Sequence, residues 1–137
     1  MKEVYYLNKE LLPTMPTPHD CLIKKIMVYN QFIEFIFEDD ISYHDSIKNM
    51  GVSFKSLKVK YHLVNEDDFS LCKWENPSDD FYRRLDNREL TELTKEKYAL
   101  EYLYHYVGYS SIIIKLFANG EILLDALVDY VEYEWIK

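Results

Sequence analysis

Glycine and proline are scarce in this sequence. Its 137 residues include only 3 Gly and 4 Pro, which argues against long linkers and disordered segments. Three widely spaced glycines also provide no glycine-rich phosphate loop, and there is no serine nucleophile elbow. We therefore expect residues 1–137 to form a single globular domain without a nucleotide site of these types.

Cysteine and long apolar runs are also rare. The only cysteines, Cys21 and Cys72, do not form a Cys-x-x-Cys pair, and both lie in apolar, strand-like contexts. This setting is typical of buried, reduced thiols, and neither residue has the local signature of a Cys–His nucleophile. The sequence has no secretory leader pattern and no apolar run long enough to span a membrane. We expect a cytoplasmic protein with no membrane partner and no catalytic residues of these classes.

Basic residues are in the minority. The chain has 16 Lys and Arg against 24 Asp and Glu, which gives a formal charge of −8. Binding to nucleic-acid phosphates requires clustered Lys and Arg, and no such cluster is present. We expect no nucleic-acid partner and no cofactor. The acidic charge favours solubility and would also steer a basic protein partner toward the chain.

Aromatic residues are abundant, with 13 Tyr, 7 Phe and 2 Trp. Large rings are typical of half-buried sheets, where they cover their cross-strand neighbours. Alternating or apolar runs bounded by turn residues predict strands over 21–28, 32–38, 52–64, 69–75 and 110–118. Pro13, Pro16 and Pro18 disfavour a helix near the start, so we expect residues 1–18 to form an irregular lead-in.

Two segments fit both a helix and a strand. In 94–107, Tyr98, Tyr102 and Tyr106 recur at helical spacing, but aromatic residues also alternate there. We favour the helix, because Asp86-x-x-Glu89 has the form of a capping box just upstream. In 121–135 the spacing of the apolar residues again fits both the helical period of about 3.6 residues and the strand period of two.

The Asn119-Gly120 turn decides our interpretation of that last segment. Asn-Gly is typical of hairpins, so we favour a strand over 121–135 with a phase change near Tyr130. We also expect a short helix within 39–51. Together these elements predict an α+β fold, in which an antiparallel sheet of five or six strands packs on one main helix near 88–107.

Two His-Asp pairs are the strongest candidates for metal chemistry. His19-Asp20 and His44-Asp45 together would suit Zn²⁺, Mn²⁺ or Fe in a metal-dependent hydrolase. Adjacent side chains in a strand point to opposite faces, however, so both members of one pair could not easily bind the same ion. We interpret Asp20 as a residue that fixes the entrance to the first strand of a hairpin, and predict no metal site.

Acidic and aromatic residues mix near the end of the chain, which suits a protein interface. There the rings would supply buried area and the acids would steer a basic partner. The expected binding residues are Asp125, Asp129, Glu132, Glu134, Trp74 and Trp135. The alternative is self-association through exposed strand edges and a tyrosine-rich surface, which would give a homo-oligomer.

The opening Pro18-His19-Asp20-Cys21, followed by a Phe- and Ile-rich hairpin, resembles the start of several small bacterial protein families. Some of these are immunity proteins of polymorphic toxin systems, in which a His-Asp pair precedes the first strand. The resemblance covers about the first 40 residues. It implies a structural role for the pair and a non-enzymatic, immunity-like protein that masks a basic partner.

Overall fold

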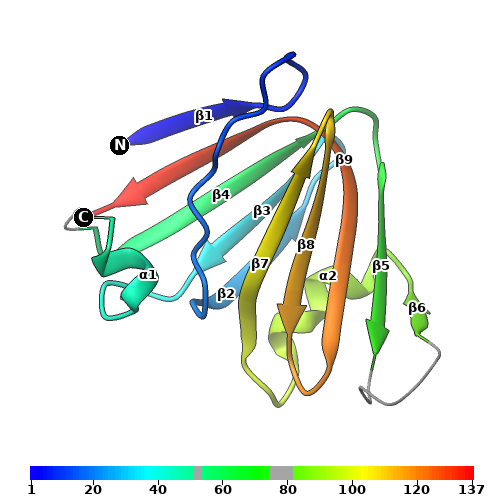
Figure 1. The fold of residues 1–137 in the computed structure, drawn as a ribbon. Helices are drawn as coiled ribbons and strands as arrows, with labels where there is room; N and C mark the ends of the chain where they lie inside the picture. The colour runs from blue at the N-terminus through cyan, green and yellow to red at the C-terminus, as the bar shows by residue number, and fades with distance from the viewer. Residues whose placement is uncertain (51–53, 75–81) are drawn as a thin grey trace.

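The computed structural model describes residues 1–50, 54–74 and 82–137, and strands dominate it (Figure 1). The described strands are β1 (Lys2–Tyr6), β2 (Leu22–Val28), β3 (Phe32–Phe37), β4 (Ser56–Leu63), β5 (Phe69–Trp74), β6 (Arg83–Leu85), β7 (Leu100–Gly108), β8 (Ser111–Phe117) and β9 (Glu121–Ile136). The helical elements are α1 (Asp45–Lys48), α2 (Glu89–Glu92) and the 3-10 turn η1 (Leu93–Lys95). Residues 52–53 and 75, at the ends of two predicted strands, lie outside the described residues.

The nine strands form one sheet that closes on itself. Its order is β4-β3-β2-β7-β8-β9-β5-β6, and the described pairings are antiparallel. Because β4 also pairs with β9, the path from β4 through β8 to β9 makes a ring. The contact between β2 and β7 is short, with only Leu22 opposite Glu101 and Ile23 opposite Leu100. The ring is therefore weakly joined at this one seam.

β9 curves through the molecule and takes part in both halves of the sheet (Figure 1). Its first half pairs with β8 and β5, and its second half pairs with β4 and β1. Between these halves the register with β4 shifts, since Leu63 faces Val128 but His62 faces Tyr130. The buried side changes from even to odd residue numbers at this bulge. The predicted strand and its phase change near Tyr130 are confirmed.

The predicted α+β fold is wrong. The main helix expected near 88–107 is limited to α2 and η1, and residues 100–108 are strand β7. Only the Glu89 half of the predicted capping box forms: Asp86 N–H donates to Glu89 Oε1 at 3.4 Å, but Asp86 Oδ1 accepts from Arg88 N–H at 2.9 Å, and Arg88 is the N-cap of α2. This helix is only one turn long. Of the tyrosines at helical spacing, Tyr98 precedes β7, while Tyr102 and Tyr106 lie on opposite sides of it because the strand shifts register between Tyr102 and Tyr104.

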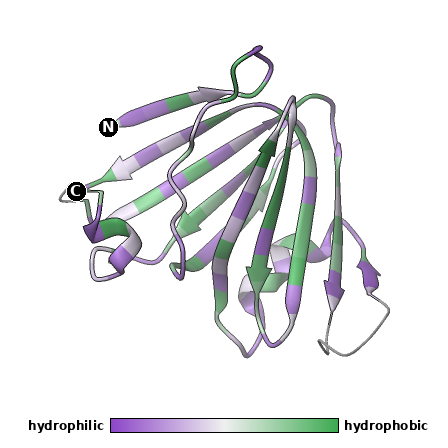
Figure 2. Ribbon diagram, in the orientation of Figure 1, coloured by the Kyte–Doolittle hydropathy of each residue, from purple (hydrophilic) through white to green (hydrophobic). Residues whose placement is uncertain are grey.

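The other sequence predictions have mixed outcomes. β2 and β3 form the expected hairpin, and Asn119 and Gly120 adopt φ values of 52° and 143° at the expected turn. α1 provides the short helix predicted within 39–51. The irregular lead-in is wrong over Lys2–Tyr6, which pairs with β9 as β1. Hydrophobic and hydrophilic residues alternate along many strands, as Figure 2 shows, so that one side of each faces the core.

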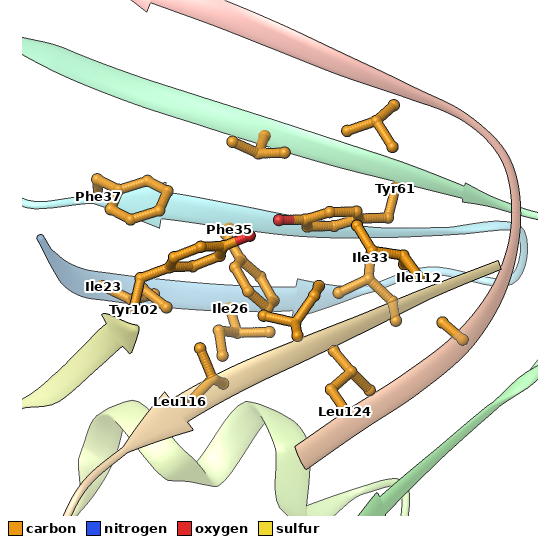
Figure 3. Packing of buried hydrophobic residues seen from close by; sticks show 14 of the residues in the cluster. Ile23, Ile26, Ile33, Phe35, Phe37, Tyr61, Tyr102, Ile112, Leu116 and Leu124 are labelled. Atoms are coloured by element: carbon orange, nitrogen blue, oxygen red, sulfur yellow. The ribbon is translucent and has the colours of Figure 1, made fainter. Parts of the chain in front are cut away.

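Three tyrosines lie fully within the core. Tyr61, Tyr102 and Tyr133 are at most 1% exposed. The Tyr102 hydroxyl lies 2.6 Å from Nδ1 of His105. Burial lowers the pKa of His105 and raises that of Tyr102, so we assign Tyr102 as the donor to a neutral imidazole. Figure 3 shows the Tyr61 and Tyr102 hydroxyls directed toward each other. Burial raises the pKa of Tyr61, while the interaction between the two hydroxyls lowers it and raises the pKa of Tyr102.

The lead-in is fastened over this polar cluster. The Tyr133 hydroxyl donates to the carbonyl of Pro16 at 2.6 Å, and His105 forms a hydrogen bond with the backbone of Met15. Buried carbonyl groups need such partners, because leaving one unpaired is costly. The prolines disfavour a helix in this segment, so its carbonyl groups are not used in helical hydrogen bonds. They can therefore accept hydrogen bonds from core side chains. The core side chains therefore hold the segment that precedes β2.

Tyr133→Phe should lower the free energy of unfolding by about 1–3 kcal/mol, because it leaves the Pro16 carbonyl without its donor. Tyr61→Phe should lower it less, by about 1 kcal/mol or under, because the hydroxyl removed faces only the Tyr102 hydroxyl, which keeps its bond to His105. Chemical denaturation of both variants measures these differences. A larger loss for Tyr61→Phe than for Tyr133→Phe would contradict the hydrogen bonds described.

Lowering the pH should destabilise the protein through His105. Its folded-state pKa lies below the usual value of about 6.5, so the unfolded chain takes up the proton first. The stabilising contribution is complete above about pH 6.5 and is lost as the pH falls toward the folded-state pKa, by up to about 1.4 kcal/mol per pH unit. Denaturation of His105→Gln at pH 7 and pH 5 should give a flatter profile. Parallel profiles would contradict a neutral buried imidazole.

Candidate functional site

His19 and Asp20 form the turn that leads into β2. Asp20 has a positive φ of 68°, and its N–H donates to the Tyr102 carbonyl at 2.8 Å. Its carboxylate lies 3.0 Å from Nδ1 of His19, and both side chains are about half exposed. The Tyr102 N–H returns a bond to Cys21 O at 2.9 Å. Backbone bonds to β7 thus fix the entrance to β2, the position that the sequence predicted for this pair.

His44 lies close to this turn but pairs with a different acid. Its Nε2 is 3.1 Å from Glu38 Oε1, and both side chains are largely buried. Ser46, two residues later in α1, donates to the carbonyl of His19 at 2.9 Å. Asp45 is exposed at the first position of α1. The structure therefore brings the two predicted pairs near each other, with Glu38 in place of Asp45 as the partner of His44.

Glu101 on β7 adds a further carboxyl to this cluster. Desolvation raises its pKa, and a hydrogen bond to Asp20 raises it further, while His19 and His44 oppose the shift. Beneath the turn, burial raises the pKa of the Cys21 thiol to about 12, so it stays protonated. Within the described residues, no group of three or more His, Cys, Asp or Glu has the geometry to hold a metal ion.

The outer side of the second half of β9 carries a charge ladder. We use this name for Lys2, Glu34, Lys58, Lys60, Glu132 and Glu134, which line one shallow depression. Glu134 faces Lys58 on one neighbouring strand and Lys2 on the other. Glu132 faces Lys60 and lies 3.3 Å from His62. Two of the acids predicted to bind a partner therefore already have cationic neighbours within the chain.

Aromatic rings continue beside the charge ladder. The His62 ring stacks on Tyr130 at 4.0 Å between ring centroids, and Tyr6 and Phe32 contact the two ends of this pair. The rings face one another across strands, as cross-strand aromatic pairs do. They therefore direct their edges, and not their flat faces, toward solvent. Burial lowers the pKa of His62, and this effect is larger than the opposing effect of the Glu132 carboxylate, which raises it.

The first half of β9 has a different outer surface, which we call the tyrosine-rich face. It lies over β7, β8 and β9, and its exposed large side chains are Tyr104, Tyr106, Tyr109, Ile113, Phe117 and Leu127. Their exposed fractions range from 38% to 68%. Tyr106 faces Ile113 across the β7–β8 pairing. The sequence analysis missed this set because it favoured a helix for the segment that contains its first members.

A register shift in β7 determines which of its tyrosines are exposed. It lies between Tyr102 and Tyr104. As a result Tyr102 points into the core, Tyr104 and Tyr106 point out, and His105 is buried between them. An extra residue in one strand re-aims the side chains that follow it, and bulges commonly have this effect. The alternation of aromatic residues along 98–106 was the sequence signal for a strand.

Acids border the tyrosine-rich face. A hollow of about 330 Å³ is lined by Asp67, Asp68, Phe69, Ser70, Asp125 and Leu127. The Leu127 N–H donates to Asp68 O at 3.0 Å, which holds the turn of Asp67 against β9. Among the described residues, no ion pair involves Asp67, Asp68 or Asp125. These acids thus differ from those of the charge ladder.

The remaining predicted binding residues are scattered. Trp74 is half-buried on the outer side of β5, where its ring lies 4.9 Å from that of Tyr82. Asp129 sits at the bulge of β9, and its carbonyl accepts from the Leu7 N–H at 2.8 Å. Trp135 is 2% exposed and donates to Glu3 Oε1 at 2.8 Å, so it is a core residue and cannot anchor a partner.

No protein-family model matches this chain, and no match is found among curated proteins or solved structures. Among the described residues, no helix has the length and apolar character needed to cross a membrane.

Proposed function

We propose that this is a non-enzymatic, cytoplasmic protein-binding module whose tyrosine-rich face binds a protein carrying Lys and Arg. The single observation that carries the proposal is the contiguous exposure of Tyr104, Tyr106 and Ile113 beside the hollow that contains Asp125.

The composition of the face supports binding. Large exposed apolar surfaces on small proteins often mark sites of interaction. Tyrosine is enriched at interface hot spots, because its ring gives buried area and its hydroxyl forms hydrogen bonds. Tyr106 and Ile113 face each other near the middle of this surface, where a partner would exclude water most completely.

Charge supports a basic partner. Asp67, Asp68 and Asp125 surround the hollow without a described ion pair, whereas the charge ladder is internally compensated. Uncompensated acids attract a cationic surface over a distance of about 8–10 Å at physiological salt. The same acids, on a chain of charge −8, disfavour a second copy of the protein at this face.

The resemblance of the opening residues to immunity proteins suggests the kind of partner. An immunity-like role would make the partner a basic toxin whose surface is masked by the tyrosine-rich face. The alternative of a metal-dependent hydrolase has weaker support, because the described His and acid side chains lack the geometry of a metal site.

The experiment is a capture assay from lysate of the source cells with wild-type protein, Tyr106→Ser, Asp125→Lys and the control Asp45→Lys. The control makes the same change in charge as Asp125→Lys, but on the exposed helix α1. We expect one basic protein to be captured by wild type and control and to be released by salt. Each face variant should weaken binding of that purified protein about tenfold or more.

Two results would contradict the proposal. One is a captured protein whose affinity falls equally in Asp45→Lys and Asp125→Lys. The other is the absence of any partner that depends on Tyr106 at either salt concentration. Light scattering that shows a stable dimer of wild type but a monomer of Tyr106→Ser would instead support self-association.

A further inference from the structure

The ring of strands has an open edge beside its weakest seam. β2 pairs with β3 from Ile23 to Val28, but with β7 only at Leu22 and Ile23. Beyond Ile23 the second edge of β2 has no strand partner among the described residues. An unpaired edge presents a row of backbone donors and acceptors, to which another extended chain can bind.

The direction of the backbone groups follows from the β2–β3 hairpin. Tyr29 N–H donates to Phe32 O at 2.8 Å, so the backbone groups of Tyr29 face β3. Successive residues of a strand direct these groups to opposite edges, so those of Ile26 and Val28 face away from β3. No described hydrogen bond reaches these outward groups.

A groove runs along this edge. It has a volume of about 380 Å³ and is lined on one side by five consecutive residues, Lys25 to Tyr29. The opposite wall is formed by Thr91, Thr94 and Lys95, from α2 and η1. Five residues of extended chain span about 17 Å, which is the length of a typical strand. The groove therefore has the length that one added strand requires.

The groove is basic on an otherwise acidic protein. Lys25 and Lys95 both line it, and none of its lining residues is acidic. Lys95 lies 3.4 Å from Glu92 on the exposed surface, and Lys25 has no described ion pair. The charge of this groove is thus opposite to that of the hollow at Asp125. The two surfaces would select different ligands.

We propose that the free edge of β2 binds an extended acidic peptide segment, which adds a strand to the sheet. Its backbone pairs with Ile26 and Val28, and its Glu or Asp side chains contact Lys25 and Lys95. The threonine hydroxyls on the other wall supply further donors and acceptors. This mode of binding uses the main chain for affinity and the lysines for selectivity. It does not depend on the function proposed for the tyrosine-rich face.

The test uses two fluorescein-labelled seven-residue peptides, one alternating Glu and Val and the other alternating Lys and Val. Wild type should bind the Glu peptide at least tenfold more tightly, and the double variant Lys25→Glu, Lys95→Glu should reverse this preference. Val28→Pro removes one outward N–H but none of the bonds to β3, so it should weaken binding about tenfold. Amide hydrogen exchange should slow at Ile26 and Val28 when the Glu peptide is bound.

Three results would overturn the proposal. They are no binding of either peptide at millimolar concentration, binding with no change in exchange at Ile26 and Val28, and an unchanged preference in the double lysine variant. Slower exchange at these amides at high protein concentration without peptide would assign the edge to a second copy of the chain. If Val28→Pro does not fold, the double lysine variant decides, because both lysines are exposed.

Discussion

One 16-residue strand, β9, hydrogen-bonds to four neighbours, and the rest of the fold depends on this. Its first half lies between β8 and β5 and its second half between β4 and β1, and the strand bends between the two halves (Figure 1). The bulge at Asp129 provides the bend and also reverses which residues, odd or even, face the core. Val128 and Val131 are therefore both fully buried, although they lie an odd number of residues apart.

The bend also divides the acids of β9 between two surfaces. In the second half, Glu132 stands opposite Lys60 of β4, and Glu134 stands opposite Lys58 of β4 and Lys2 of β1. These lysines compensate the negative charge of both glutamates within the chain. In the first half, Asp125 shares one hollow with Asp67 and Asp68 and another with Arg84, and no ion pair of the described residues involves it. The two halves of one strand thus differ: the first presents the tyrosine-rich face, and the second pairs with β4 and β1, where it closes the sheet.

Local signals in the sequence predicted most strands, because hairpin turns and alternation depend on neighbouring residues. The segment that became β7 was misassigned, because its tyrosines satisfied both periods and the bulge near Leu103 could not be inferred from spacing alone. The surroundings of the candidate binding residues were predicted less well. Asp125 was placed on an outer face correctly, but Trp135 is buried, since burial at the end of β9 depends on long-range packing against Phe54.

The central claim is that β9 joins both parts of the sheet into one cooperative unit. Native-state amide hydrogen exchange tests it most directly, by comparing Leu124 in the first half with Tyr133 in the second. We predict that both amides exchange only through global unfolding, with the same free energy of opening and the same dependence on denaturant. A lower free energy of opening for Tyr133, reached without unfolding of Leu124, would contradict the claim.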